Sequence, residues 1–130
     1  MEAKNILFAF TEMGRQTAGR IVQALGLPPE GVRCFVPERL QADGFEGFEN
    51  LAQVVGTLFA QAETLVFVGA AGIAVRAAAP YLESKLTDPA VIVVDEQARY
   101  VIPILSGHVG GANAYAQHLA VLLGALPVIT

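Results

Sequence analysis

The stretch Leu65–Arg76, LVFVGAAGIAVR, decides the fold class of this chain. It opens with four apolar residues in a row, Leu65–Val68, which is typical of a strand covered on both faces. Gly69 ends this strand, and a segment with apolar residues at helical spacing follows from about Gly72. A buried strand that leads through glycine into a helix is the repeating unit of a parallel α/β sheet.

The same unit recurs along the chain. Further segments have the apolar character of strands: Ile6–Phe10, Val32–Val36, Ala90–Val94, Tyr100–Leu105 and Leu126–Ile129. Apolar residues at helical spacing predict helices within 11–25, 48–59, 72–80 and 110–123. The polar residues 37–47 are expected to form a loop.

The connections between these segments predict the type of sheet. Helices between successive strands indicate parallel neighbours, whereas the short link Asp95–Arg99 indicates an antiparallel hairpin. Thr11 is a candidate helix cap, Gly26 a candidate helix end and Pro80 a helix break. We therefore expect a single α/β domain over residues 1–130, with three layers: a mainly parallel sheet, helices on both of its faces, and one β-hairpin.

Composition narrows the classes of function. Apolar residues make up 54% and charged residues 15% of the chain, which is too apolar and too weakly charged for a disordered protein. The net charge of −4 and the scattered basic residues argue against nucleic-acid and membrane partners. No apolar run approaches the ~20 residues of a membrane span, and the first apolar run is too short for a signal peptide. We expect a soluble, cytoplasmic protein.

The chain offers little for a protein-bound metal. Its one cysteine, Cys34, lies in an apolar run and is expected to be buried, so a cysteine-cluster site is excluded. The two histidines, His108 and His118, fall at opposite ends of one predicted helix, roughly 15 Å apart at 1.5 Å per residue. They cannot share a metal, so the sequence predicts no metal site.

The glycines of VGAAGIAVR, residues 68–76, are the first candidate binding residues. Gly69 and Gly72 let backbone amides approach a ligand, and the start of a helix favours an anion. The motifs that bind nucleotide phosphates are absent, so the anion is not necessarily a phosphate. Arg76, one helical turn after Gly72, could pair with a carboxylate. The plainer alternatives are a tight turn that needs glycine and a solvated helix arginine.

The second candidate is LSGHVGGAN, residues 105–113. His108 precedes a predicted helix start, where the helix dipole favours the neutral imidazole that can accept a proton from water. Gly107, Gly110 and Gly111 clear space around it, and Ser106 and Asn113 can supply hydrogen bonds. The plainer alternative is a histidine that bonds to its own loop.

Both glycine loops follow predicted strands. Because ligands of open α/β sheets bind at the carboxyl ends of the strands, we expect residues 69–76 and 105–113 to be neighbours in one cleft. Asp88, Asp95 and Glu96 are candidate carboxylates for chemistry, with the plainer alternative that they are turn residues.

The residues from Leu65 to Thr130 resemble a known family. The stretches VGAAGIAVR, TDPAVIVVDE and LSGHVGGAN together are similar to those of the cobalamin-biosynthesis protein CbiG, the cobalt-precorrin-5A hydrolase of the anaerobic vitamin B12 pathway. The first 64 residues resemble this family only in their general pattern, a strand followed by a Thr-Glu-x-Gly turn at Thr11–Gly14 and a helix. The resemblance covers about half the chain and its motifs are specific in combination.

The resemblance implies a function. Members of this family open a δ-lactone on ring A of a cobalt-bound tetrapyrrole and release a two-carbon unit as acetaldehyde. The cobalt is carried by the substrate, so no further cofactor is implied, and a C-terminal CbiG domain or a separately encoded partner would complete the protein. Lactone opening needs a base and a dipole facing the developing oxyanion, roles that fit His108 and the amides near Gly110 and Gly111. The alternative is a tetrapyrrole-binding module without catalysis of its own, in which a histidine could ligate cobalt.

Overall fold

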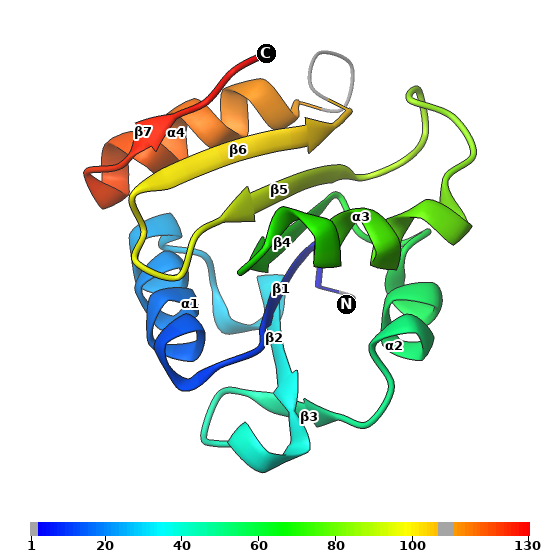
Figure 1. Ribbon diagram of the computed structural model, residues 1–130, viewed down its shortest axis with the longest axis vertical. Coiled ribbons are helices and arrows are strands. Elements are labelled where there is room, and N and C mark those ends of the chain that lie inside the picture. Colours follow the sequence, from blue (N-terminus) through cyan, green and yellow to red (C-terminus); the bar gives the residue numbers. More distant parts are fainter. Residues whose placement is uncertain (1–2, 107–110) are drawn as a thin grey trace.

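The computed structural model describes residues 3–106 and 111–130 as one sheet with helices on both faces (Figure 1). The strands of the sheet are β1 (Asn5–Ala9), β2 (Val32–Pro37), β3 (Glu46–Phe48), β4 (Thr64–Val68), β5 (Ala90–Val94), β6 (Tyr100–Leu105) and β7 (Leu126–Pro127). The helices are α1 (Glu12–Leu25), α2 (Leu51–Leu58), α3 (Ala71–Ala78) and α4 (Ala112–Leu123), with short 3-10 turns at Pro29–Gly31, Glu38–Leu40 and Ala79–Tyr81.

The strand order is β3-β2-β1-β4-β5-β6-β7. Every neighbouring pair is parallel except β5 and β6, which are antiparallel and are joined by the predicted hairpin at Asp95–Arg99. The three-layer, mainly parallel fold class predicted from the sequence is thus confirmed. The chain order turns back on itself between β1 and β4, which is the place where open sheets of this kind form a crevice.

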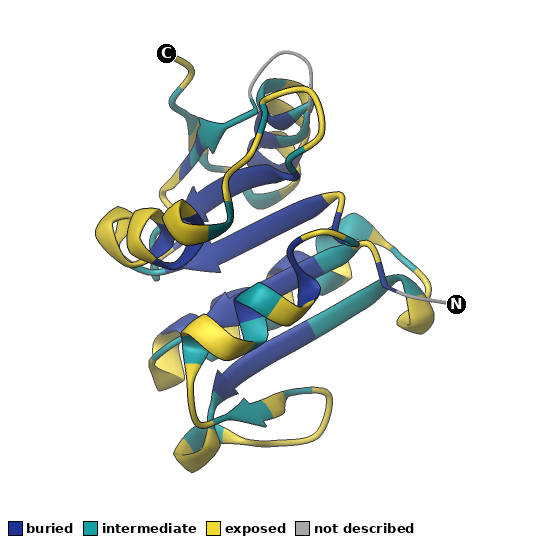
Figure 2. Cartoon of the chain, turned by 90° about the vertical axis from the view of Figure 1, so that its right-hand side faces the viewer, coloured by how far each residue is buried: buried dark blue, intermediate teal, exposed yellow. Residues whose placement is uncertain are grey.

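Two apolar clusters fill the space between the three layers, and Figure 2 shows that the central strands of the sheet are buried. One lies under α1 and α4 and contains Ile21 and Leu119, and the other lies under α2 and α3 and contains Phe8 and Phe67. Strands β4 and β5 are buried along their whole length because they contribute alternate residues to both clusters. Because both faces of these strands are buried, their sequences are apolar at nearly every position.

The predicted ends of the first and third helices are confirmed. The side chain of Thr11 accepts a hydrogen bond from the Gly14 N–H at 3.0 Å, and α1 ends at Gly26 in the left-handed conformation. Helix α3 ends at Ala78, and Pro80 lies in the 3-10 turn that follows, where it needs no amide hydrogen bond. Cys34 is buried, and burial, with a smaller contribution from Glu46, raises the pKa of its thiol to about 11.

Residues 37–59 differ from the prediction. Phe48 was expected to begin a helix, but it ends β3, a short edge strand that pairs in parallel with β2. The helix begins only at Leu51, because the Asn50 side chain accepts a hydrogen bond from the Gln53 N–H at 3.1 Å and caps it. The expected loop therefore contains a strand, held at the sheet edge by a two-point ion pair between Arg33 and Glu46. Within residues 3–106 and 111–130, no helix is long and apolar enough to cross a membrane.

Candidate functional site

The two predicted glycine loops lie at opposite ends of the strands. Strand β5 runs parallel to β4, with Val94 beside Val68, and β6 runs antiparallel, with Leu105 beside Val91. Gly69 therefore follows the carboxyl end of β4, whereas Ser106 lies beside the amino end of β5. The expectation of one shared cleft is wrong. The hairpin reverses β6, so the carboxyl end of β6 lies at the amino ends of the parallel strands, opposite to Gly69.

At the carboxyl ends, Gly69 is required by the backbone. Its φ is +153°, a conformation open to glycine alone, and its N–H donates to the Val94 carbonyl at 2.9 Å. A Cβ there would lie 3.3 Å from the Phe10 ring. Gly72, in the first turn of α3, is exposed, and a Cβ there would meet nothing within 4 Å. The turn explains Gly69 but not Gly72.

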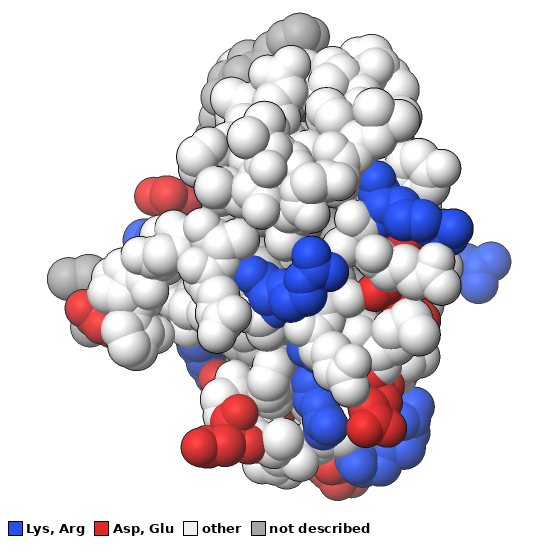
Figure 3. Space-filling view, turned by 90° about the vertical axis from the view of Figure 1, so that its left-hand side faces the viewer, with Lys and Arg blue, Asp and Glu red and all other residues white. Residues whose placement is uncertain are grey.

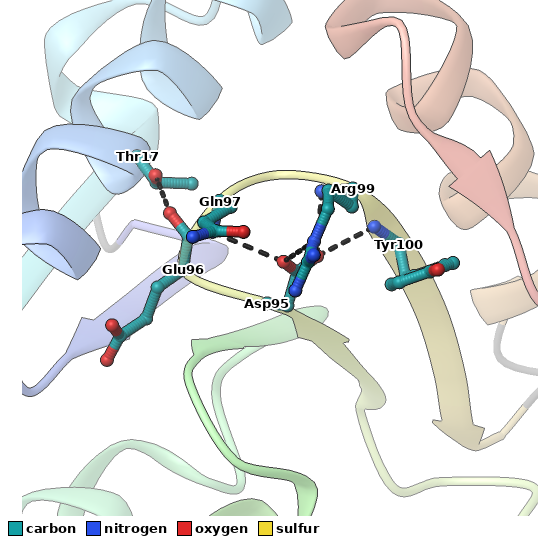
Figure 4. A network of polar contacts seen from close by, with 6 residues as sticks. All are labelled: Thr17, Asp95, Glu96, Gln97, Arg99 and Tyr100. Carbon is teal, nitrogen blue, oxygen red and sulfur yellow. Dashed lines mark hydrogen bonds and ion pairs between the residues drawn. The ribbon is translucent and has the colours of Figure 1, made fainter.

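A hollow of about 350 Å³ opens beside Gly69 at the same end of the sheet. Its walls come from the start of α1, the turn after β4 and the β5–β6 hairpin: Met13, Gly69, Ala70, Asp95, Glu96, Gln97 and Arg99. The hairpin residues in this wall form a network of hydrogen bonds with one another and with α1 (Figure 4).

Asp95 is the centre of this network. Its carboxylate accepts hydrogen bonds from the N–H groups of Arg99 and Tyr100 at 2.7 Å and of Gln97 at 3.2 Å, and from the Arg99 guanidinium at 3.4 Å. Partial burial alone would raise the pKa of Asp95, but these donors outweigh it and hold the pKa below its ordinary value. The interpretation of Asp95 as a turn residue is confirmed.

Glu96 ties the hairpin to α1. Its backbone carbonyl accepts a hydrogen bond from the buried Thr17 hydroxyl, and its carboxylate accepts one from the Thr11 hydroxyl at 2.9 Å. The hydrogen-bonding groups of this hairpin are thus largely engaged within the protein. The polar groups of the hairpin that line this hollow therefore hold the turn and attach it to α1.

At the amino ends, Ser106 and the start of α4 form a second polar region, here called the amino-end corner and defined by Asp88, Ser106, Gly111 and Asn113. The Ser106 carbonyl accepts a hydrogen bond from the Ala112 N–H at 3.1 Å, and its hydroxyl lies 3.4 Å from the Asp88 carbonyl oxygen. Ser106 has a φ of +60°, unusual for a residue with a side chain. The strand end, the helix start and the segment before β5 thus meet here.

Helix α4 begins at the amino-end corner without a side-chain cap from the residues that the structure describes, as α3 does at the carboxyl ends of the strands. Its N-cap is Gly111 at a φ of +81°, which cannot supply a capping oxygen. Asn113, in the first turn, is partly exposed. The backbone amides of an uncapped first turn favour a bound anion or a developing negative charge.

Asp88 acts as a turn residue, as predicted, but it closes the turn that precedes it. Its carboxylate accepts hydrogen bonds from the N–H groups of Glu83 and Ser84 at 3.0 and 3.1 Å. This turn borders a hollow of about 390 Å³, whose other wall is formed by α2 and Tyr81. The amino-end corner therefore has an adjoining cavity on the α2 and α3 side of the sheet.

The remaining predicted residues lie partly inside and partly outside the part of the chain that the structure describes. Arg76 is exposed in the last turn of α3, on the side of the helix away from buried Ala74 and Ala78. His118 is exposed on α4, as expected of a surface residue. Gly107, His108 and Gly110 lie outside the described residues, so their predicted roles stay predictions.

Sequence reasoning missed the meeting of Asp88 with Ser106 and the hydrogen bond between the Tyr115 hydroxyl and Asn5, 3.1 Å long. The hairpin at Asp95–Arg99 was the available signal, since a reversed β6 must bring its end back to the start of β5. In the part of the chain that the structure describes, no three His, Cys, Asp or Glu residues gather in a way that could hold a metal ion.

Fold and sites together define a class. This is an open-sheet α/β protein with glycine-bearing turns at both ends of its strands and without the glycine motifs that bind nucleotide phosphates. Its uncapped helix start and polar amino-end corner suit an anionic organic ligand.

Comparison with known proteins identifies the family. The sequence profile described as "Cobalamin synthesis G N-terminal" matches residues 53–130, and the chain belongs to this family. A cobalt-precorrin-5A hydrolase from Salmonella typhimurium is 45% identical over 128 residues, which cover 95% of this chain. A cobalt-precorrin-5A hydrolase from Priestia megaterium is 42% identical over 81 residues, or 62% of this chain.

The fold has a relative among solved structures. A cobalamin biosynthesis protein G homologue from Sulfolobus solfataricus superposes with a TM-score of 0.73 over 97% of this chain, at 28% sequence identity. The chain spans 34% and 22% of the two curated relatives and 36% of the solved chain. It therefore corresponds to about a third of its longer relatives.

Proposed function

We propose that this chain takes part in opening the ring-A δ-lactone of a cobalt-precorrin and releasing a two-carbon unit as acetaldehyde, as the N-terminal part of a cobalt-precorrin-5A hydrolase. The observation that carries this proposal is the 45% identity to the Salmonella hydrolase along 95% of the chain. The cobalt is part of the substrate and is not a resident metal.

The reaction is assigned to the amino-end corner. A lactone opens when a base takes a proton from water and a dipole stabilises the oxyanion that forms. We assign the base to His108, which lies two residues after Ser106 in the sequence. The first turn of α4 after Gly111 supports the second role, because backbone amides at a helix start stabilise a developing negative charge; the Ala112 N–H already donates to Ser106, so the role is assigned to the amides that follow it.

The neighbouring groups are proposed to bind the substrate. The Ser106 hydroxyl and the Asn113 amide can bond to ring substituents, and Gly107 and Gly110, which carry no side chain, are assigned to the approach of a flat macrocycle. Arg76 can pair with a carboxylate, since helix α3 runs from the carboxyl ends of the strands toward their amino ends and Arg76 lies in its last turn. Gly69 lies about 16 Å away along a five-residue strand and is assigned to its turn, whereas Gly72 is exposed, with nothing within 4 Å of the place of a Cβ.

The test uses a full-length enzyme. The matched region of the Salmonella hydrolase is replaced by this chain, and the chimera is incubated with cobalt-precorrin-5A while acetaldehyde is measured. Acetaldehyde release by the chimera, and none by the remaining two thirds alone, is expected. A folded chimera that binds the substrate but releases no acetaldehyde would contradict the proposal.

A second candidate is a binding module that presents the macrocycle to the rest of the enzyme. It is favoured by one observation: the chain spans only about a third of its relatives, so the chemistry has room to lie elsewhere. The two candidates differ in the effect of changing His108. Ligation of cobalt by a histidine would alter the absorbance spectrum of the cobalt-corrinoid on binding, whereas base catalysis needs no such change.

A further inference from the structure

The last 31 residues of the chain contain no Lys, Arg, Asp or Glu. All twenty such side chains lie between Glu2 and Arg99. The segment Tyr100–Thr130 nevertheless builds β6, α4 and β7 at one edge of the molecule. Figure 3 shows the consequence on one face, where the upper part of the surface carries no charged side chain. A surface without charge is unusual for a region that meets water only.

One face of β6 and β7 also lacks a covering helix among the described residues. Helix α4 packs against β5, β6 and β7 from one side, whereas on the other side α3 packs against β4 and β5. Ile102 and Ile104 point to that other side, where they contact the cluster under α2 and α3 but stay only partly buried. The helix layer on this side stops one strand short of β6.

The exposed residues of this face are large and apolar. Tyr100 shares the face of Ile102 because it lies two residues away, and Leu126 pairs with Tyr100 in register on β7. Tyr100 is 42% exposed and Leu126 59% exposed. We define Tyr100, Ile102, Ile104 and Leu126 as the open face. It borders the outer side of β7, which has no further strand beside it in the described chain.

We infer that the open face is the surface on which the remaining two thirds of the hydrolase packs. This inference rests on the proposed function. The relatives carry about twice as much chain again beyond the matched part, and that chain must meet this domain somewhere. A partly apolar sheet face beside an unpaired strand edge offers it burial and backbone hydrogen bonds, and the Arg99 guanidinium lies beside this face, 5.8 Å from the centre of the Tyr100 ring.

The other occupants fit less well. A membrane surface is normally met by apolar residues with many lysines or arginines around them, whereas residues 100–130 contain neither and the hollow beside Tyr100 and Leu126 is lined by two arginines, Arg20 and Arg99. A second copy of the chain would pair two identical β7 edges. Such self-association depends on protein concentration, which distinguishes it from packing of the rest of the hydrolase.

The experiment measures thiol labelling at single cysteines in two settings, the 130-residue chain and the chimera with the rest of the Salmonella hydrolase. Tyr100→Cys and Leu126→Cys report on the open face. Val121→Cys is the matched control, because Val121 is 81% exposed on α4, which covers the opposite side of the sheet. Thr57→Cys on α2 is a second control. The native Cys34 is buried and adds little background, and other cysteines of the relative are changed to serine.

Labelling at Tyr100→Cys and Leu126→Cys should be at least about tenfold slower in the chimera than in the short chain, while both controls keep their rates. Equal rates in both settings, or equal protection at Val121→Cys, would overturn the inference. Protection in the short chain that disappears on dilution would assign the face to a second copy instead. Should the chimera fail to fold, cysteines at the aligned positions of the full-length Salmonella hydrolase give the same readout. Activity is not read, so a failed acetaldehyde assay leaves the result interpretable.

Discussion

The two ends of the parallel strands differ in what they leave available. At the carboxyl ends, Asp95 accepts three backbone N–H groups, and Glu96 is tied to Thr11 and Thr17. At the amino-end corner, helix α4 starts without a side-chain cap and the Ser106 hydroxyl has one long contact. At the end where open sheets usually bind ligands, the β5–β6 hairpin is held by its own hydrogen bonds, although a hollow of about 350 Å³ lies beside it and α3 also starts there, at Ala70, without a side-chain cap.

The difference shows how one reversed strand moves a site. If β6 ran parallel to β5, residues 105–113 would leave the sheet beside Gly69. The five-residue turn between β5 and β6 is too short for a parallel crossover, so β6 must return and deliver this segment to the amino ends. The comparison of the two ends can be tested at single residues.

The largest expected effect is at His108, the residue assigned as base in the proposed function, which follows Ser106 by two residues in the sequence. His108→Gln keeps the size and a hydrogen bond but cannot take up a proton, so lactone opening in the chimera should fall by ~10²–10⁴. Substrate binding should change little. The measurement is single-turnover acetaldehyde release beside a binding titration. Normal turnover with a lowered melting temperature would make His108 a structural residue of its loop.

At the carboxyl ends of the strands, we expect substitution of Asp95 to change the stability of the fold. Asp95→Ala removes the acceptor of three backbone N–H groups and should lower the free energy of unfolding by about 1.5–3 kcal/mol in urea titrations. The matched control is Gln97→Ala, which leaves the backbone donor in place. A loss of the same size in both variants would show that the Asp95 hydrogen bonds are not the cause.

This contribution also has a pH dependence of known sign. The folded pKa of Asp95 is lowered, so its stabilisation is present above the ordinary aspartate pKa near ~3.9 and is lost as the pH falls through the lower folded value. The difference between the wild type and Asp95→Ala should therefore shrink between neutral pH and about pH 2. A constant difference would contradict the assignment.

Gly69 and Gly72 differ in whether the backbone conformation requires glycine. Gly69→Ala should destabilise the fold by about 1–3 kcal/mol, because its φ of +153° suits glycine alone and the new Cβ would meet Phe10. Gly72→Ala should stabilise by roughly 0.5–1 kcal/mol, since it lies in a helix with nothing within 4 Å. Thermal unfolding of both variants measures the contrast, and shifts of the same sign would refute it.

The smallest expected effect is at Arg76. Arg76→Met removes one exposed charge-assisted contact to a substrate carboxylate and should weaken binding by about 1 kcal/mol, or roughly fivefold in Kd. An absorbance titration of the chimera with the cobalt-precorrin at low salt gives this value. Unchanged binding there would place Arg76 on the solvated surface only.

Much of the fold follows from local sequence. The strand–glycine–helix pattern at Leu65–Arg76, the helix ends at Thr11 and Gly26 and the hairpin at Asp95–Arg99 are all present as expected, because each rests on contacts within a few residues. Strand β3 could not be foreseen. Its three residues are a strand only because β2 lies beside them, and their apolar spacing fits a helix equally well.

By itself, the sequence determined the class of this protein, because continuous apolar runs and segments with apolar residues every 3.6 positions, separated by glycine, are buried as strands and helices in layers. It also determined that residues 100–130 carry no charge. Only the tertiary structure decided which groups meet. The direction of β6 brings Ser106 to Asp88 and away from Gly69, and the width of the helix layers leaves Tyr100 and Leu126 exposed. Pairing direction and burial are properties of contacts between distant segments, which no local pattern contains.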